Sequence, residues 1–279
     1  MIKLMYITNN VDIAKIAENA GVERIFVDME YIGKDLRQGG KDTVQNHHTI
    51  ADVKRIKGCL TRAELLVRCN PIHDKIDGYS SKEEIDAIVE SGADAIMLPY
   101  FKTADEVKVF IDLVGGRAKT VPLIETPEAV EVIDEILKIE GIDEIFIGLN
   151  DLSLGYGKTF MFELLSDGTV EGLCNKFKQK GIPYGFGGIA SIGKGLLHSE
   201  HVIKEHYRLG STNAILSRSF CNADKIGDVE KVRTIFNEEL KKIRDFEAEC
   251  EKEDSSYEQN RLEMSKKVEE IVNDIKSRS

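Results

Sequence analysis

The chain has 279 residues and a mass of 31.3 kDa, with 42% hydrophobic and 31% charged residues. This composition supports a large apolar core and excludes wholesale disorder. The formal net charge of −11 and the isoelectric point near 5.2 make nucleic acid and anionic membranes poor partners, so we expect neither.

Signals for membrane insertion or secretion are missing from the sequence. No run of 18 apolar residues occurs, and the start MIKLMYITNN lacks the apolar core of a signal peptide. The five cysteines form no C-x-x-C pair, which is typical of free thiols in a reducing compartment. We therefore expect a cytoplasmic protein.

Eight short apolar runs alternate with helical patterns along residues 1–224. The runs are Ile2–Thr8, Arg24–Glu30, Glu64–Asn70, Ala95–Tyr100, Thr120–Glu125, Glu144–Asp151, Pro183–Gly188 and Thr212–Phe220. Apolar residues on both faces are typical of buried parallel strands. Eight strands, each followed by a helix, predict an α/β fold of the (β/α)8 TIM-barrel type. A doubly wound sheet is the alternative, and it would need a nucleotide-binding fingerprint.

Helix boundaries carry recognisable capping signals. Thr49 and Asp52 form a predicted capping box, and Pro127 lies near the start of a helix predicted over residues 128–137. Further helices are predicted over residues 12–19, 81–90 and 104–113. The polar segment 31–48 follows the second strand, so in a barrel it would lie at the carboxyl-end face, where active sites form.

The last 55 residues, 225–279, differ from the rest of the chain. They contain 27 charged residues and a single glycine, and their apolar residues recur at helical spacing. We therefore divide the chain into a barrel domain over residues 1–224 and a C-terminal helical extension over residues 225–279. The alternative for the extension is a frayed, charged helix.

Two carboxylates end consecutive predicted strands. Glu125 closes the run VPLIE and Asp151 closes the run IFIGLND. Neighbouring parallel strands lie about 4.8 Å apart, so both side chains can point at one site above the barrel. Such a pair suits Mg²⁺ or Mn²⁺, with water and substrate oxygens completing the coordination. Alternatively, Glu125 caps the following helix and Asp151 starts a turn.

Charged side chains also end the second and third strands. Arg68 could bind a substrate carboxylate through its bidentate fork, or it could form a structural ion pair with Glu125 or Glu30. Alternation along the strand sends Asp28 and Glu30 to the same side, where they could support a metal-bound water or simply be solvated.

The polar loop and the glycine-rich segments offer weaker candidates. His47 and His48 could move a proton, or they could lie in a solvated loop. GYGKT at 155–159 lacks the first glycine of a phosphate-binding loop, and GFGGIA at 185–190 comes late for a dinucleotide fold. Gly187, Gly188 and Arg218 could hold a phosphorylated substrate or coenzyme A, or they could form a tight turn with an ion-paired arginine.

Together these residues resemble the HpcH/HpaI aldolase/citrate lyase family. The matching stretches are VDMEY (27–31), LVRCNP (66–71), GADAIMLPYFKTADEV (92–107), PLIETPEAV (122–130) and GIDEIFIGLNDLSLGYG (141–157). They cover the second to sixth strands in the family's order. The resemblance implies a barrel of the phosphoenolpyruvate/pyruvate type.

The resemblance also implies roles for individual residues. Glu125 and Asp151 match the divalent-metal ligands, and Arg68 matches the arginine that binds the keto-acid carboxylate or a thioester carbonyl. The expected catalytic residues are Arg68, Asp28, Glu30 and His48. Gly148 lies where a glycine lets substrate approach the backbone, and the further expected substrate-binding residues are Leu149, Asn150, Tyr31 and Arg218.

The implied activity is a divalent-metal-dependent carbon–carbon lyase that cleaves a 4-hydroxy-2-keto acid to pyruvate and an aldehyde. The alternative within the family is an acyl-CoA lyase of the citrate or malyl-CoA type. The resemblance further implies a homo-oligomer, a trimer or hexamer, assembled through the C-terminal helices. Tyr31 replaces the family's usual histidine and Arg218 reverses a usual acidic charge, which permits a catalytically weak ligand-binding or assembly protein instead.

Overall fold

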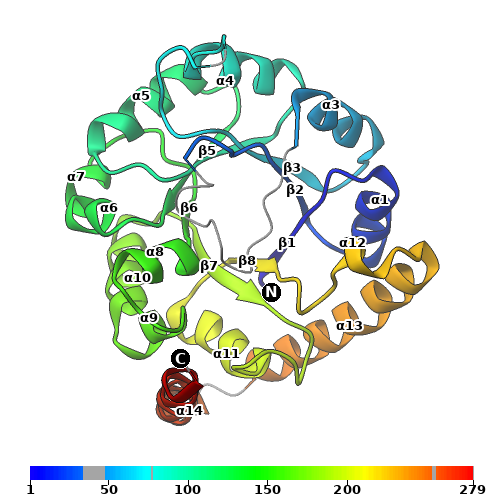
Figure 1. Cartoon of the computed structure of the whole chain (residues 1–279), viewed down its shortest axis with the longest axis vertical. Helices are drawn as coiled ribbons and strands as arrows, with labels where there is room; N and C mark the ends of the chain where they lie inside the picture. Colours follow the sequence, from blue (N-terminus) through cyan, green and yellow to red (C-terminus); the bar gives the residue numbers. More distant parts are fainter. Residues whose placement is uncertain (34–47, 77, 253–255, 279) are drawn as a thin grey trace.

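The computed structural model describes residues 1–33, 48–76, 78–252 and 256–278, and its strands form a closed barrel (Figure 1). All neighbouring strands are parallel and follow the order of the sequence. The strands are β1 (Lys3–Ile7), β2 (Arg24–Asp28), β3 (Glu64–Arg68), β4 (Ala95–Leu98), β5 (Lys119–Ile124), β6 (Ile145–Ile147), β7 (Tyr184–Ile189) and β8 (Asn213–Leu216). The predicted TIM barrel is confirmed, and the doubly wound alternative is wrong.

Helices surround the barrel on its outside (Figure 1). They are α1 (Val11–Ala20), α3 (Ile50–Cys59), α4 (Ser81–Glu90), α5 (Ala104–Val114), α6 (Pro127–Glu131), α7 (Ile133–Ile136), α8 (Leu149–Gly155), α9 (Glu163–Ser166), α10 (Thr169–Lys180), α11 (Ser199–Leu209), α12 (Ala223–Ile226), α13 (Val229–Cys250) and α14 (Tyr257–Arg278). The capping box of Thr49 with Asp52 is confirmed, and Pro127 is the first residue of α6. The helix predicted over residues 128–137 is two short helices, because the backbone leaves helical geometry at Val132.

Alternate residues of each strand point into the barrel and form layers. The register pairs Arg24 with Glu64, Phe26 with Leu66, and Asp28 with Arg68. The first pair belongs to a buried ion cluster at the amino ends of the strands, and the second to an apolar layer inside the barrel. The third pair lies at the carboxyl ends. The layering therefore places charged side chains above an apolar floor.

Several predicted strands end one or two residues too late, and two extend four residues too far. Residues up to Asp151 were expected in the sixth strand, but β6 ends at Ile147 and α8 begins at Leu149, because Leu149 and Leu152 are buried at helical spacing. Asp151 therefore lies in the first turn of a helix. Similarly, β8 ends at Leu216 instead of Phe220, and Arg218 lies in the turn that follows.

The two C-terminal helices occupy different places. Helix α13 packs against α1 and α11 and completes the ring of helices, whereas α14 packs outside this ring against α9 and α11 (Figure 1). The predicted extension thus contributes one helix to the ring and one beyond it, while its oligomerisation role stays a prediction. Within the described ranges, none of the helices combines the length and the apolar character needed to span a bilayer.

Candidate active site

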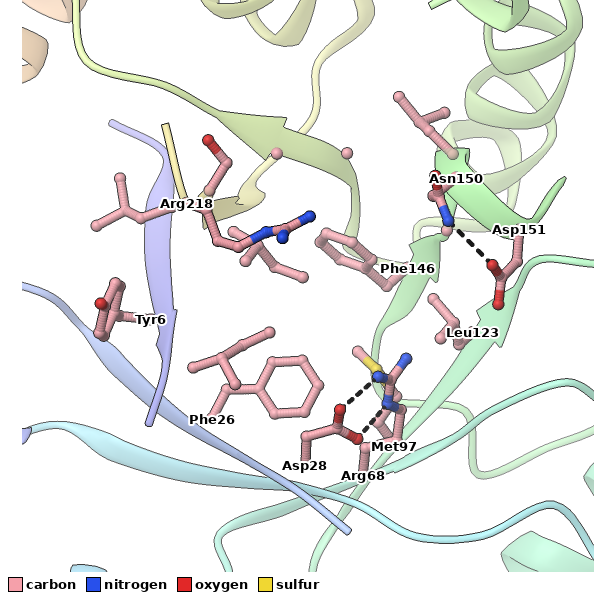
Figure 2. Close-up of a pocket in the computed structure, with 18 of the residues that line it drawn as sticks. Tyr6, Phe26, Asp28, Arg68, Met97, Leu123, Phe146, Asn150, Asp151 and Arg218 are labelled. Carbon is pink, nitrogen blue, oxygen red and sulfur yellow. Dashed lines mark hydrogen bonds and ion pairs between the residues drawn. The ribbon is translucent and has the colours of Figure 1, made fainter. Parts of the chain in front are cut away.

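A cavity of about 400 Å³ opens at the carboxyl ends of the strands (Figure 2). Its floor is apolar and includes Phe26, Met97, Leu123 and Phe146 from the layer inside the barrel. The charged residues that line it are Asp28, Arg68, Glu125, Asp151, Arg218 and Asp224. The cavity therefore collects both predicted metal ligands and both predicted substrate-binding arginines.

Arg68 and Asp28 form a bidentate ion pair inside this cavity (Figure 2). The Nε and Nη2 groups of Arg68 each donate to one carboxylate oxygen of Asp28 at 2.8 Å, and Nη1 lies 3.4 Å from Glu30. Burial alone would lower the pKa of Arg68, but the charges of Asp28 and Glu30 outweigh it and raise the pKa above its usual value. Arg68 thus stays charged, and Asp28 occupies one edge of its guanidinium group.

Glu125 is buried, with 4% of its surface exposed, and it is held by backbone groups. Its Oε1 accepts a hydrogen bond of 2.9 Å from the backbone N–H of Tyr100, the one non-glycine described residue with a positive φ, at 48°. On its other side lies Gly148, where a Cβ would be 2.9 Å from Oε2 of Glu125. The glycine therefore leaves room for the carboxylate, while the strained Tyr100 backbone orients it.

Asp151 enters the cavity from the first turn of α8. It accepts a hydrogen bond of 3.1 Å from the side-chain amide of Asn150, and both residues line the cavity, as does Leu149 (Figure 2). The three predicted substrate-binding residues 148–150 are thus brought together with both predicted metal ligands.

The donor chemistry of Glu125 and Asp151 fits a hard divalent ion. Carboxylate oxygens are the ligands that Mg²⁺ and Mn²⁺ prefer, and Mg²⁺ usually keeps several waters. Among the residues that the structure describes, no group of three or more His, Cys, Asp or Glu side chains is close enough to hold a metal. An ion held by Glu125 and Asp151 would therefore take its other ligands from water and substrate.

Three other predicted site residues are not in contact with the cavity itself. Within the described part of the chain, the residues that line the cavity do not include Glu30, Tyr31 or His48, although Glu30 lies 3.4 Å from Nη1 of Arg68. Tyr31 is 43% exposed, and the Nδ1 of His48 accepts a hydrogen bond of 3.0 Å from the backbone N–H of Asp28. His48 therefore binds the backbone at the end of β2. His47 lies outside the described residues.

Several lining residues were missed by the sequence analysis. Tyr6, the last residue but one of β1, lines the cavity and donates to the backbone carbonyl of Cys221 at 3.1 Å, and burial raises the pKa of its hydroxyl. Asp224 and Asn222 line the cavity from the segment after β8. The position of Tyr6 near the carboxyl end of the predicted strand Ile2–Thr8 was the feature of the sequence that could have identified it as a site residue. Asn222 and Asp224 could not be identified in this way, because the predicted strand ran to Phe220 and the segment after β8 was therefore misplaced.

The fold and the cavity define a TIM barrel of the enzyme type, with its charged side chains at the carboxyl ends of the strands. A family model described as HpcH/HpaI aldolase/citrate lyase matches residues 3–162, which is more than half of the chain. The chain belongs to the HpcH/HpaI aldolase/citrate lyase family.

Individual relatives are distant. A hydroxypyruvate/pyruvate aldolase of Sagittula stellata is 26% identical over 153 residues, which cover 44% of this chain and 59% of that protein. The chain thus spans about three fifths of the length of this curated relative.

Solved structures agree in fold. An HpcH/HpaI aldolase from Desulfitobacterium hafniense matches 87% of this chain and 93% of its own, with a TM-score of 0.58 and 17% identity. A family protein from Burkholderia cenocepacia matches 83% and 95%, with a TM-score of 0.58 and 14% identity. The citrate synthase SbnG matches 81% and 89%, with a TM-score of 0.57 and 16% identity.

Proposed function

We propose that this protein is a divalent-metal-dependent carbon–carbon lyase that cleaves a 4-hydroxy-2-keto acid to pyruvate and an aldehyde. One observation carries the proposal: Glu125, Asp151 and the Arg68–Asp28 pair line a single cavity in a member of the aldolase/citrate lyase family. The relative from Sagittula stellata, a hydroxypyruvate/pyruvate aldolase, supports the same substrate class.

The reaction breaks the bond between C3 and C4 of the keto acid. The C4 hydroxyl loses its proton and becomes the aldehyde, the electron pair of the broken bond forms an enolate, and a proton added at C3 gives pyruvate. Negative charge therefore grows on the C2 oxygen. A site that lowers this barrier needs positive charge at that oxygen and a base near the C4 hydroxyl.

Arg68 supplies a fixed positive charge. Asp28 accepts hydrogen bonds from its Nε and Nη2 groups and Glu30 lies 3.4 Å from Nη1, so an oxygen of the keto acid would share the guanidinium group with these two carboxylates. Asp28 lines the cavity whereas His48 does not, and we assign the proton of the C4 hydroxyl to this carboxylate. The apolar floor under both groups excludes water and strengthens their electrostatic effect.

Glu125 and Asp151 would hold Mg²⁺ or Mn²⁺. When bound, such an ion supplies Lewis-acid stabilisation of the enolate charge. The Tyr100 N–H and the missing side chain of Gly148 orient Glu125 for this role.

The test is pyruvate release from a panel of 4-hydroxy-2-keto acids with Mg²⁺, with Mn²⁺ and with EDTA. We expect EDTA to abolish turnover and Glu125→Gln to lower kcat/KM by about 100-fold or more. The control Glu131→Gln, at an exposed position at the end of α6, should leave kcat/KM and its sensitivity to EDTA unchanged.

Two results would contradict the proposal. Turnover that is equal in the wild type and in Glu125→Gln would exclude the assigned site. Cleavage of malyl-CoA or citramalyl-CoA, without release of pyruvate from any keto acid of the panel, would select the acyl-CoA lyase instead.

A further inference from the structure

The cavity has two charged ends separated by an apolar surface. At one end lie Asp28 of β2, Arg68 of β3, Glu125 directly after β5, and Asp151 of α8. At the other end lies Arg218, in the turn after β8. Figure 2 shows the guanidinium group of Arg218 extending from the β8 side into the cavity toward Phe146. A substrate that fills the cavity therefore meets a second polar region beyond the apolar floor.

The two ends differ in the charged side chains that line them. At the first end Arg68 is paired with Asp28 and Glu30, and Glu125 and Asp151 are the proposed metal ligands. At the second end, Arg218 and Asp224 are the charged residues among the described residues that line the cavity. With the keto-acid head at the first end, a second anionic group at the far end of the substrate would lie beside Arg218.

The glycines of β7 let neighbouring side chains pack closely along this wall of the cavity. Gly187 has a φ of 54°, and a Cβ there would lie 2.7 Å from Cδ1 of Leu149. The neighbouring Gly188 would place a Cβ 3.3 Å from that of Ser217, beside Arg218. Both glycines line the cavity. The missing side chains therefore allow Leu149 and Ser217 to pack against β7 at the lining of the cavity.

The volume of the cavity also indicates a substrate that is larger than pyruvate. Its volume of about 400 Å³ is within the range of ligand pockets, roughly 300–1,000 Å³. Pyruvate, with six non-hydrogen atoms, fills only part of it. The reacting substrate is therefore expected to carry a substantial tail.

We infer that Arg218 binds a terminal anionic group, a carboxylate or a phosphate, at the tail of the keto-acid substrate, and that it selects the aldehyde product accordingly. This inference rests on the proposed lyase function. Arginine is suited to the role because its planar fork matches both carboxylate and phosphate.

The experiment compares three 4-hydroxy-2-keto acids with the same head and a methyl, a carboxylate or a phosphate tail. Pyruvate release gives kcat/KM for each, and the measured quantity is the ratio of an anionic to the methyl-tailed substrate. We expect this ratio to be well above one in the wild type and to fall about 10-fold or more in Arg218→Gln, mainly through KM. Arg218→Lys should restore part of it. The larger of the two wild-type ratios identifies carboxylate or phosphate.

The matched control is Arg233→Gln, on the exposed face of α13, which should leave the ratio unchanged. Cleavage of the methyl-tailed substrate with no preference for either anionic tail would overturn the inference and leave the lyase function standing. An anionic preference that persists in Arg218→Gln would also overturn it. If none of the three acids is cleaved, the lyase function fails and this inference fails with it.

Discussion

At the scale of single residues, the candidate metal site depends on the absence of a side chain at Gly148. A Cβ there would lie 2.8 Å from the Cβ of Glu125 and 2.9 Å from its Oε2. Gly148→Ala should therefore displace the carboxylate, weaken Mn²⁺ binding by about 10- to 100-fold and cost about 1–3 kcal/mol of unfolding free energy. Calorimetric titration and urea denaturation measure the two effects. Gly172→Ala, on the exposed face of α10, should leave Mn²⁺ binding unchanged, and equal affinity in both variants would contradict the assignment.

The same scale shows what the sequence could predict about the site. Glu125, Arg68 and Asp28 were found because each lies at or next to the end of an apolar run, where a parallel barrel gathers its functional side chains. An ion pair of Arg68 with Glu30 was considered and is confirmed at 3.4 Å, but Asp28, which forms the bidentate pair, was not considered. The missing information is strand register, which sets Asp28 directly opposite Arg68 and depends on the assembled sheet.

At the scale of elements, apolar periodicity located all eight strands but misplaced some ends. The run IFIGL before Asn150 is apolar enough for a strand, yet its last residue, Leu149, begins a helix with Leu152 on the same buried face. Short apolar runs do not distinguish a buried strand from the first turn of a buried helix. Asp151 consequently reaches the cavity from the first turn of a helix. It still lines the same cavity as Glu125, because this turn follows directly after the carboxyl end of β6.

Helix α14 provides a prediction at this scale, because its buried residues pack on the same chain. Met264 is fully buried against the barrel side of the molecule, and Asn260 bonds to His201 and Glu205 of α11. Met264→Ala should cost about 2–4 kcal/mol in urea denaturation, independently of protein concentration. Leu262→Ala, at 59% exposure, should change stability by less than about 0.5 kcal/mol. A cost for Met264→Ala that vanishes on dilution would mean that α14 docks on another subunit instead.

At the scale of the whole molecule, the barrel is closed at its amino end by buried ion pairs. Arg24, with 1% of its surface exposed, donates to Glu144 and to Glu64, and Lys119 also donates to Glu64. Burial alone would raise the pKa of Glu64, but the hydrogen bond from Lys119 and the charge of Arg24 outweigh it and lower the pKa from 4.5 to about 2. The same strands that carry the site at their carboxyl ends are thus tied together at the opposite end.

This cluster predicts how the stability of the protein depends on pH. Because the pKa of Glu64 is lower in the folded state, its contribution is fully present above the unfolded value near 4.5 and is lost as the pH falls toward about 2. Glu64→Gln should therefore lower the unfolding free energy by about 2–3 kcal/mol at pH 7. Its difference from the wild type should shrink steadily below about pH 5, as urea denaturation across the pH range would measure. Glu238→Gln, exposed on α13, should show no such dependence. If the cost of Glu64→Gln were as large at pH 3 as at pH 7, the lost contact would be one of packing and the charge of Glu64 would not stabilise the barrel.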